Sequence, residues 1–214
     1  MVLNLGGVYG ILNMLGKIKF MRIFEKLKKY SEGIVDRFPE DAETLDLCSP
    51  IISSEELDSL CSLKVLPGSY IDVASQIALL GKEIGYFQLS PVPEKTLFDS
   101  ITSSYSKKNP YFSKFELINA VQVASFEAEP IGVIKRDYEN EGEVFILNIL
   151  EPSMAACKIA NSFQDFILFA CKLDTIRECH EGPNAVGEFI EFLQDEFPDT
   201  SQDAWQEIAE IVLL

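Results

Sequence analysis

Three runs decide the fold: Ala120-Val-Gln-Val-Ala-Ser-Phe126, Ile131-Gly-Val-Ile-Lys135 and Glu143-Val-Phe-Ile-Leu-Asn-Ile149. Each run is short and rich in β-branched residues, and turn residues, including Asn140 and Gly142, separate the second from the third. The pattern predicts three strands of an antiparallel meander. The third run is apolar on both faces, so we expect it to be central in the sheet, with helices covering at least one side.

Helical patterns lie on both sides of these runs. Upstream, the spacing predicts three helices, which begin at Ser53 or Ser54, at Pro67 and after Pro93. We expect the second of them to end at Gly81. Downstream, helical spacing returns at Ser162, where Asp165 completes a capping-box pattern, and two more helices close the chain. This order indicates an α+β fold: an antiparallel sheet of about three to five strands flanked by N-terminal and C-terminal helices.

The same patterns divide the chain into three parts: an N-terminal extension over 1–52, an α+β domain over 53–180 and a C-terminal helical extension over 181–214. The first 20 residues are apolar, but their positive charges follow the apolar run, so they match neither a secretion signal nor a membrane span. The simplest interpretation is an upstream start codon, with Met21 as the natural beginning. A weak interfacial anchor is the alternative.

The charge balance bears on possible partners. The chain of 214 residues carries 34 Asp and Glu against 18 Lys and Arg, a net charge of −16. Such a surface repels phosphate backbones, so we expect no direct binding to nucleic acid. It attracts basic surfaces on other proteins. Ordinary solubility is the alternative explanation of the same charge.

The five cysteines form neither a CxxC motif nor a cluster with histidine. This usage is typical of a reducing cytosol and of buried thiols that pack as small apolar groups, so we predict a cytoplasmic protein. Cys171 and Cys179 lie eight residues apart on one apolar helical stripe. We interpret both as core residues and not as metal ligands, because the two-residue spacings of zinc sites are absent.

Catalytic chemistry finds little support in the sequence. His180 is the only histidine, at the end of a predicted helix, and the phosphate-binding and zinc-hydrolase motifs are missing. Glu127 and Glu129 alternate beside Pro130, so their carboxylates could serve acid/base or divalent-metal chemistry. They could equally be solvated turn residues. We therefore predict a protein that is not an enzyme and that has no cofactor and no metal.

A second group of acids lies between the second and third predicted strands. Asp137, Glu139, Glu141 and Glu143 alternate there around Tyr138. Such a run is most often a solvated loop. It also makes a compact negative patch on which a basic partner could dock.

Several motifs, in this order, resemble the SUKH superfamily of fungal cell-wall-assembly regulators and bacterial immunity proteins. They are Leu66-Pro-Gly-Ser-Tyr70, Gly85-Tyr-Phe-Gln-Leu-Ser-Pro91, Val123-Ala-Ser-Phe-Glu-Ala-Glu-Pro-Ile131, Glu143-Val-Phe-Ile-Leu147 and Ile159-Ala-Asn-Ser-Phe-Gln-Asp-Phe-Ile167. The resemblance covers about residues 53–180. The N-terminal extension and the two added helices after Gly182 depart from the family pattern.

The resemblance implies a noncatalytic protein-binding domain, most simply an immunity protein that binds and neutralises a toxin, such as a nuclease with a basic surface. A regulatory or scaffold protein with a housekeeping partner is the alternative, and a metal-dependent enzyme using the Glu127 and Glu129 pair is a third class. The predicted partner-binding residues are Asp137, Tyr138, Glu139, Glu141, Glu143, Glu127 and Glu129. For aromatic anchors we expect Tyr138, with Tyr86 or Phe87 as further candidates, although Gly-Tyr-Phe beside Ser-Pro is more typical of a core.

Overall fold

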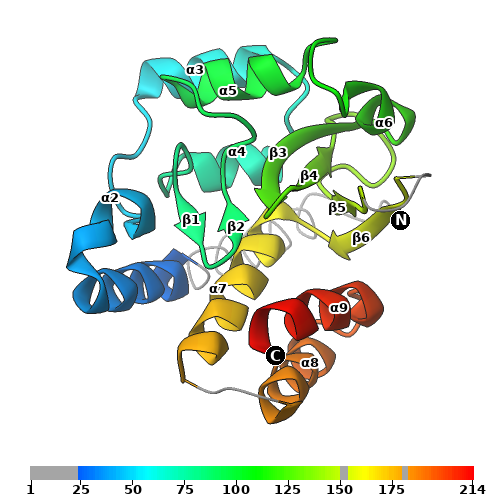
Figure 1. Cartoon of the computed structure of the whole chain (residues 1–214). Coiled ribbons are helices and arrows are strands. Elements are labelled where there is room, and N and C mark those ends of the chain that lie inside the picture. Colours follow the sequence, from blue (N-terminus) through cyan, green and yellow to red (C-terminus); the bar gives the residue numbers. More distant parts are fainter. Residues whose placement is uncertain (1–23, 150–153, 180–182) are drawn as a thin grey trace, which may run out of the picture.

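A computed structural model describes residues 24–149, 154–179 and 183–214 (Figure 1). The sheet has six antiparallel strands that lie side by side in the order of the sequence. The strands are β1 (Glu83–Ile84), β2 (Phe87–Gln88), β3 (Ala120–Phe126), β4 (Glu129–Ile134), β5 (Val144–Leu147) and β6 (Ala156–Ala160). The α+β prediction and the meander are confirmed, and the strand count is slightly above the expected range.

The three strands that the sequence analysis singled out are β3, β4 and β5, and β5 lies inside the sheet between β4 and β6. The strands it did not single out are short or ambiguous. β1 and β2 have only two residues each, which is too short for an alternating pattern to appear. The sequence of β6 consists of two alanines, a cysteine, a lysine and one isoleucine, and this composition gives only a weak strand pattern.

Residues 24–37 are helical, and a 3-10 turn and further helices follow. They are η1 (Pro39–Asp41), α2 (Ala42–Leu45), α3 (Ser54–Ser62), α4 (Gly68–Ala74), α5 (Leu97–Ser104), α6 (Phe112–Leu117), α7 (Phe163–Cys179), α8 (Pro183–Glu196) and α9 (Gln202–Leu213). No described helix is long and apolar enough to cross a membrane. The predicted start at Met21 and the apolar run before it lie outside the described residues.

Side-chain caps fix where two of the predicted helices begin. The Ser53 hydroxyl accepts a hydrogen bond from the amide of Glu56 at 3.2 Å, at the start of α3. At the start of α7 the Ser162 hydroxyl accepts from the amide of Asp165 at 3.1 Å and donates to its carboxylate at 2.8 Å. These two N-termini lie where the sequence predicts them.

The predicted end of the second helix was wrong. α4 ends at Ala74 rather than at Gly81, and turns follow. The amide of Ala78 donates to the carbonyl of Leu47 at 2.8 Å, so a contact with the N-terminal segment replaces the next helical hydrogen bond. The apolar residues Ile77 and Ala78 are nevertheless buried, because the turn directs them into the same core that a helix would have faced.

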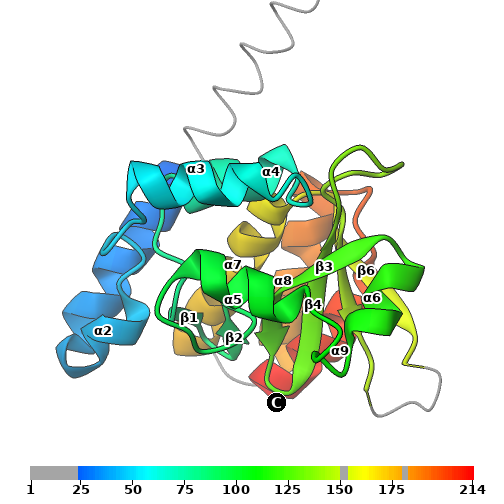
Figure 2. The same cartoon turned by 90° about the horizontal axis from the view of Figure 1, so that it is seen from above.

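The two faces of the sheet contact different layers: α6 packs on one face, whereas α7 belongs to the main core on the other (Figure 2). Alternation along β4 shows how this happens: Ile131 and Val133 belong to the main core, whereas Ile134 belongs to a smaller core built with Phe115 of α6. Gly132, between Ile131 and Val133, lies directly beneath the Phe115 ring, and a Cβ at that position would overlap the ring. Glycine is therefore what lets α6 approach the sheet so closely.

The main core extends beyond 53–180 in both directions. It includes Leu27 from the N-terminal helix, and Phe189 and Trp205 from α8 and α9. The Trp205 ring contacts the rings of Phe87, Phe169 and Phe189, with centroids 5.5–5.9 Å apart. The division into 1–52, 53–180 and 181–214 stays a prediction, but the described parts of all three regions share this apolar cluster.

Candidate functional site

The predicted partner-binding residues lie at opposite ends of β4. Glu127 and Glu129 lie at the β3–β4 turn, whereas Asp137 to Glu143 lie in the loop that follows the other end of the strand. The six residues of β4 span five steps of roughly 3.3 Å, so about 17 Å separates the two groups. The structure therefore forms two separate acidic surfaces and not one.

In the β4–β5 loop, two of the four predicted acids serve internal contacts. The Glu141 carboxylate accepts hydrogen bonds from the amides of Asp137 at 3.0 Å and of Gly68 at 3.3 Å, so it joins the loop to the beginning of α4. Glu143 forms an ion pair with Lys158 at 2.6 Å, and its side chain is only 18% exposed. Both carboxylates are thus engaged within the chain, although Glu141 itself remains exposed.

The rest of this loop is exposed and carries both signs of charge. Asp137, Tyr138 and Glu139 are exposed, with Tyr138 at 48%. The ammonium group of Lys135 lies 5.7 Å from the centre of the Tyr138 ring and pairs with Glu116. Lys135 is buried, and Glu116 balances its charge.

Acidic side chains from three elements converge at the other end of β4. Glu127 is exposed at the turn with a φ of 47°, and its amide donates to the carbonyl of Tyr86 at 3.1 Å. Burial, followed by the charges of Glu127 and of Glu207 on α9, raises the pKa of Glu129. A hydrogen bond from the backbone of Ile149 acts in the opposite direction. These carboxylates therefore repel one another.

Tyr86 is the aromatic residue on this surface. Its side chain is 41% exposed, and its ring lies edge-on to Phe126 at 6.4 Å and beneath the Arg177 guanidinium at 5.7 Å. Its neighbour Phe87 points the other way and is 2% exposed in the main core. The core interpretation of this pair is therefore correct for Phe87 and wrong for Tyr86. We call Tyr86, Glu127, Glu129 and Glu207 the Tyr86 surface.

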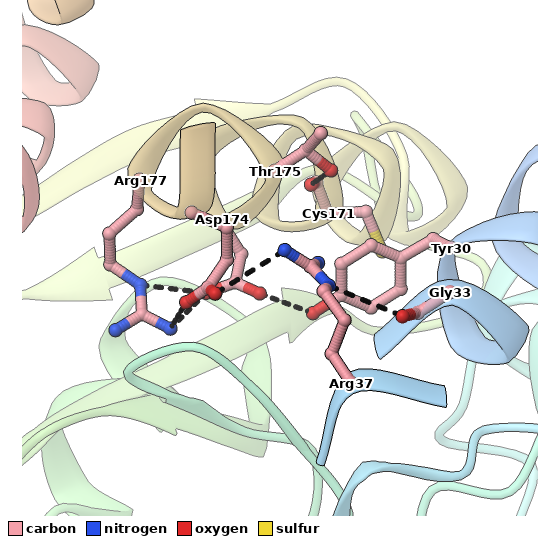
Figure 3. Close-up of polar contacts among 8 residues, drawn as sticks. Tyr30, Gly33, Arg37, Cys171, Asp174, Thr175 and Arg177 are labelled. Carbon is pink, nitrogen blue, oxygen red and sulfur yellow. Dashed lines mark hydrogen bonds and ion pairs between the residues drawn. The ribbon is translucent and has the colours of Figure 1, made fainter. Parts of the chain in front are cut away.

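Figure 3 shows the network around the buried Asp174 that holds Arg177 in place. Asp174, 3% exposed, accepts hydrogen bonds from the Tyr30 hydroxyl at 2.6 Å and from Arg177 Nε at 2.9 Å. Arg177 also pairs with Glu178 at 2.7 Å. Although burial disfavours its charge, Asp174 and then Glu178 keep the pKa of Arg177 above its ordinary value. Burial, followed by the neighbouring Cys171 and Asp174, raises the pKa of the Tyr30 phenol.

The same carboxylate packs against the backbone that presents Tyr86. Gly85 has a φ of 55°, and a Cβ there would lie 2.7 Å from the Asp174 carboxylate, so glycine meets both the backbone and the space requirement. Tyr30, Asp174 and Arg177 thereby connect the N-terminal helix, α7 and the β1–β2 hairpin. A tyrosine fixed in this way loses less conformational entropy when a partner binds it.

The exposure of the cysteines differs from the prediction that they are buried. Only Cys171 is buried; Cys61, Cys157 and Cys179 are exposed, and Cys48 is intermediate. Cys179 is the last residue of α7, and it leaves the buried stripe although its spacing from Cys171 fits that stripe. The described residues contain no group of three or more side chains able to hold a metal ion. His180 lies outside them.

Sequence reasoning missed the charge of the C-terminal part of the chain. Residues 178–214 contain ten Asp and Glu and no Lys or Arg. In α9 this produces an exposed stripe of Glu207, Glu210 and Ile211, with Glu207 continuing the Tyr86 surface. A count of charges along the chain would have revealed the bias. Only the structure shows that Glu207 comes close enough to Glu129 to influence its charge.

Comparison with protein-family models, with curated proteins and with solved structures finds no match. The resemblance to the SUKH superfamily therefore rests on the motifs in the sequence.

Proposed function

We propose that this protein is a noncatalytic protein-binding domain and that a basic protein partner docks on the Tyr86 surface. The observation that carries the proposal is the group of three acids at this end of β4, together with the neighbouring exposed Tyr86. Glu127 and Glu207 act on Glu129, the amide of Glu127 donates to the carbonyl of Tyr86, and Arg177 lies over the Tyr86 ring. Binding hot spots commonly combine a fixed aromatic residue with a rim of charge. The other end of β4 is less suitable, because two of its acids, Glu141 and Glu143, are engaged in contacts within the chain.

The electrostatics favour a cationic partner at this position. The raised pKa of Glu129 reflects burial and the repulsion from Glu127 and Glu207, so its charge is held at an energetic cost. A Lys or Arg side chain from a partner would relieve that repulsion. The net charge of −16 adds long-range steering, which accelerates association at low salt.

The SUKH resemblance supports a specific form of this proposal. Its bacterial members are immunity proteins, and a nuclease toxin presents Lys and Arg to phosphates, so an acidic inhibitor would match that surface. We therefore propose toxin neutralisation in the cytoplasm as the role of the domain. A regulatory protein of the same superfamily with a housekeeping partner is the alternative, and a toxin gene beside this one would favour immunity.

The test is a binding experiment in which matched variants alter each end of β4. The purified chain is used as bait for the products of neighbouring genes, and affinity is measured at low and high salt. Tyr86→Ala, and Glu127→Lys combined with Glu129→Lys, should each weaken binding at least about tenfold. The control is Tyr138→Ala combined with Asp137→Lys, at the other end, and it should bind as the wild type does. Loss of binding only in the control would refute the assignment of the Tyr86 surface.

A further inference from the structure

A hollow of about 790 Å³ lies where the end of α5 approaches β3. It is bounded by the C-terminal half of α5, by the segment 106–111 that follows, by Pro91 and Val92, and by Gln122 of β3. Pockets that hold small molecules usually measure about 300–1,000 Å³ and combine apolar walls with a few polar groups. The size and the lining of this hollow fit that description.

The charge of the hollow is opposite to that of the chain. Its lining includes Lys107 and Lys108 and contains no Asp or Glu. Three other hollows that contain lysine also contain a carboxylate: Glu83 in one, Glu32 in another and Glu196 in the third. Glu94 accepts a hydrogen bond from Ser103 of the lining at 3.0 Å but is not itself part of the lining. In a chain with 34 acids and 18 bases, this local excess of cations favours an anionic ligand.

A buried amide supplies a second, independent argument. Gln122 is 6% exposed, and its side-chain oxygen accepts a hydrogen bond from the Asn109 amide at 2.8 Å. Asn109 is itself fixed, because it also donates to the carbonyl of Ser104 at 2.8 Å and accepts from the amide of Tyr111 at 2.9 Å. The orientation of the Gln122 amide is thereby set. Gln122 is part of the lining of the hollow, so its side-chain nitrogen is a donor that a bound molecule could use.

We propose that this hollow binds a small molecule in which a phosphate or carboxylate group is carried on an apolar body. The Gln122 amide nitrogen would donate to an anionic oxygen, and Lys107 and Lys108 would neutralise its charge. Val92 and the Tyr111 ring provide apolar wall for the rest of the ligand. The site is independent of the Tyr86 surface, and neither proposal depends on the other.

The overall charge of the protein does not exclude an anion here. At physiological ionic strength the Debye length is about 8 Å, so exposed acids on distant elements are largely screened. The lysines of the lining are close enough to act directly. Local composition, rather than the net charge of −16, therefore decides what this hollow attracts.

The test is an NMR titration of the full chain with four probes: inorganic phosphate, phenyl phosphate, benzoate and phenol. We expect saturable shifts of the Gln122 side-chain amide with phenyl phosphate or benzoate, and the tighter of these two identifies the preferred anionic group. Phenol should bind much more weakly, because it lacks the charge. Inorganic phosphate should bind more weakly than phenyl phosphate, because it lacks the apolar body.

Three variants make the test specific. Lys107→Ala combined with Lys108→Ala should weaken binding about tenfold. Gln122→Glu keeps the shape and the acceptor for Asn109 but replaces the donor by a carboxylate, so binding should be lost; urea unfolding establishes that this variant is folded. Lys64→Ala, an exposed lysine elsewhere, should bind as the wild type does. Absence of saturable shifts, equal binding of phenol, or unchanged affinity in the double lysine variant would each overturn the proposal.

Discussion

Replacement of Asp174 by asparagine should destabilise the fold and loosen the support of Tyr86. The substitution keeps the size of the side chain and one acceptor but removes the charge that Tyr30 and Arg177 both contact. Because Asp174 is 3% exposed, water cannot replace these contacts without local opening. The effect is therefore larger than that of a surface ion pair.

The expected cost follows from the contacts. A hydrogen bond to a charged group contributes about 1.5–3 kcal/mol, and breaking a fully buried ion pair costs about 3–5 kcal/mol. Arg177 is 34% exposed on its side chain and keeps Glu178 as a partner, so the loss should lie toward the lower end. We expect Asp174→Asn to reduce the free energy of unfolding by about 2–3 kcal/mol. For a chain of this size that is a decrease in Tm of about 5–10 °C.

The measurement is urea unfolding of the wild type, Asp174→Asn, Tyr30→Phe and the double variant. The double-mutant cycle should give a coupling free energy above about 0.5 kcal/mol between Tyr30 and Asp174. Asp36→Asn is the control, because Asp36 is an exposed acid on the same N-terminal helix as Tyr30. If Asp174→Asn is as stable as this control, the buried network does not hold the N-terminal helix to α7.

Three further outcomes follow from other contacts. Gly132→Ala should lower the free energy of unfolding by about 1–3 kcal/mol, because its Cβ meets the Phe115 ring, and Phe115→Leu in the same chain should recover part of that loss. Glu129→Gln should stabilise the protein by about 0.2–1 kcal/mol at pH 7. That gain should disappear as the pH falls through the raised pKa of Glu129, because Glu129 of the wild type is then protonated and uncharged like the glutamine. A gain independent of pH would show that the charge of Glu129 is not what destabilises the wild type. A thiol reagent should modify the exposed Cys61 and spare Cys171, whose pKa is raised by burial; mass spectrometry of the native protein distinguishes them.

The sheet was predictable where its strands are long enough to show a pattern. β3, β4 and β5 alternate or are continuously apolar, and both features follow from the environment of each strand. The two-residue strands β1 and β2 carry no such signal, because they are too short, and β2 is placed by its pairing with β3. Likewise the spacing of Ile77 and Ala78 fits a helix, but a hydrogen bond to Leu47 decides the backbone there.

The candidate site was less predictable, because its geometry comes from contacts between distant residues. The alternating acids of the β4–β5 loop look alike in sequence, yet Glu141 binds the amide of Gly68, 73 residues earlier, whereas Glu139 remains exposed. The approach of Glu207 to Glu129 similarly spans most of the C-terminal half of the chain. Sequence patterns report local periodicity and charge, and they do not report such pairings.

The contact of Trp205 with β6 has a consequence for association between copies of the chain. β6 is the last strand of the sheet, and the register shift opposite Val144 and Phe145 leaves Ile159 with no partner residue on β5. The indole of Trp205 donates to the carbonyl of Ile159 at 2.5 Å, so a helix occupies an acceptor that another strand could otherwise use. Exposed strand edges template aggregation. Besides completing the core, α9 thus protects an open border of the sheet from pairing with a neighbouring molecule.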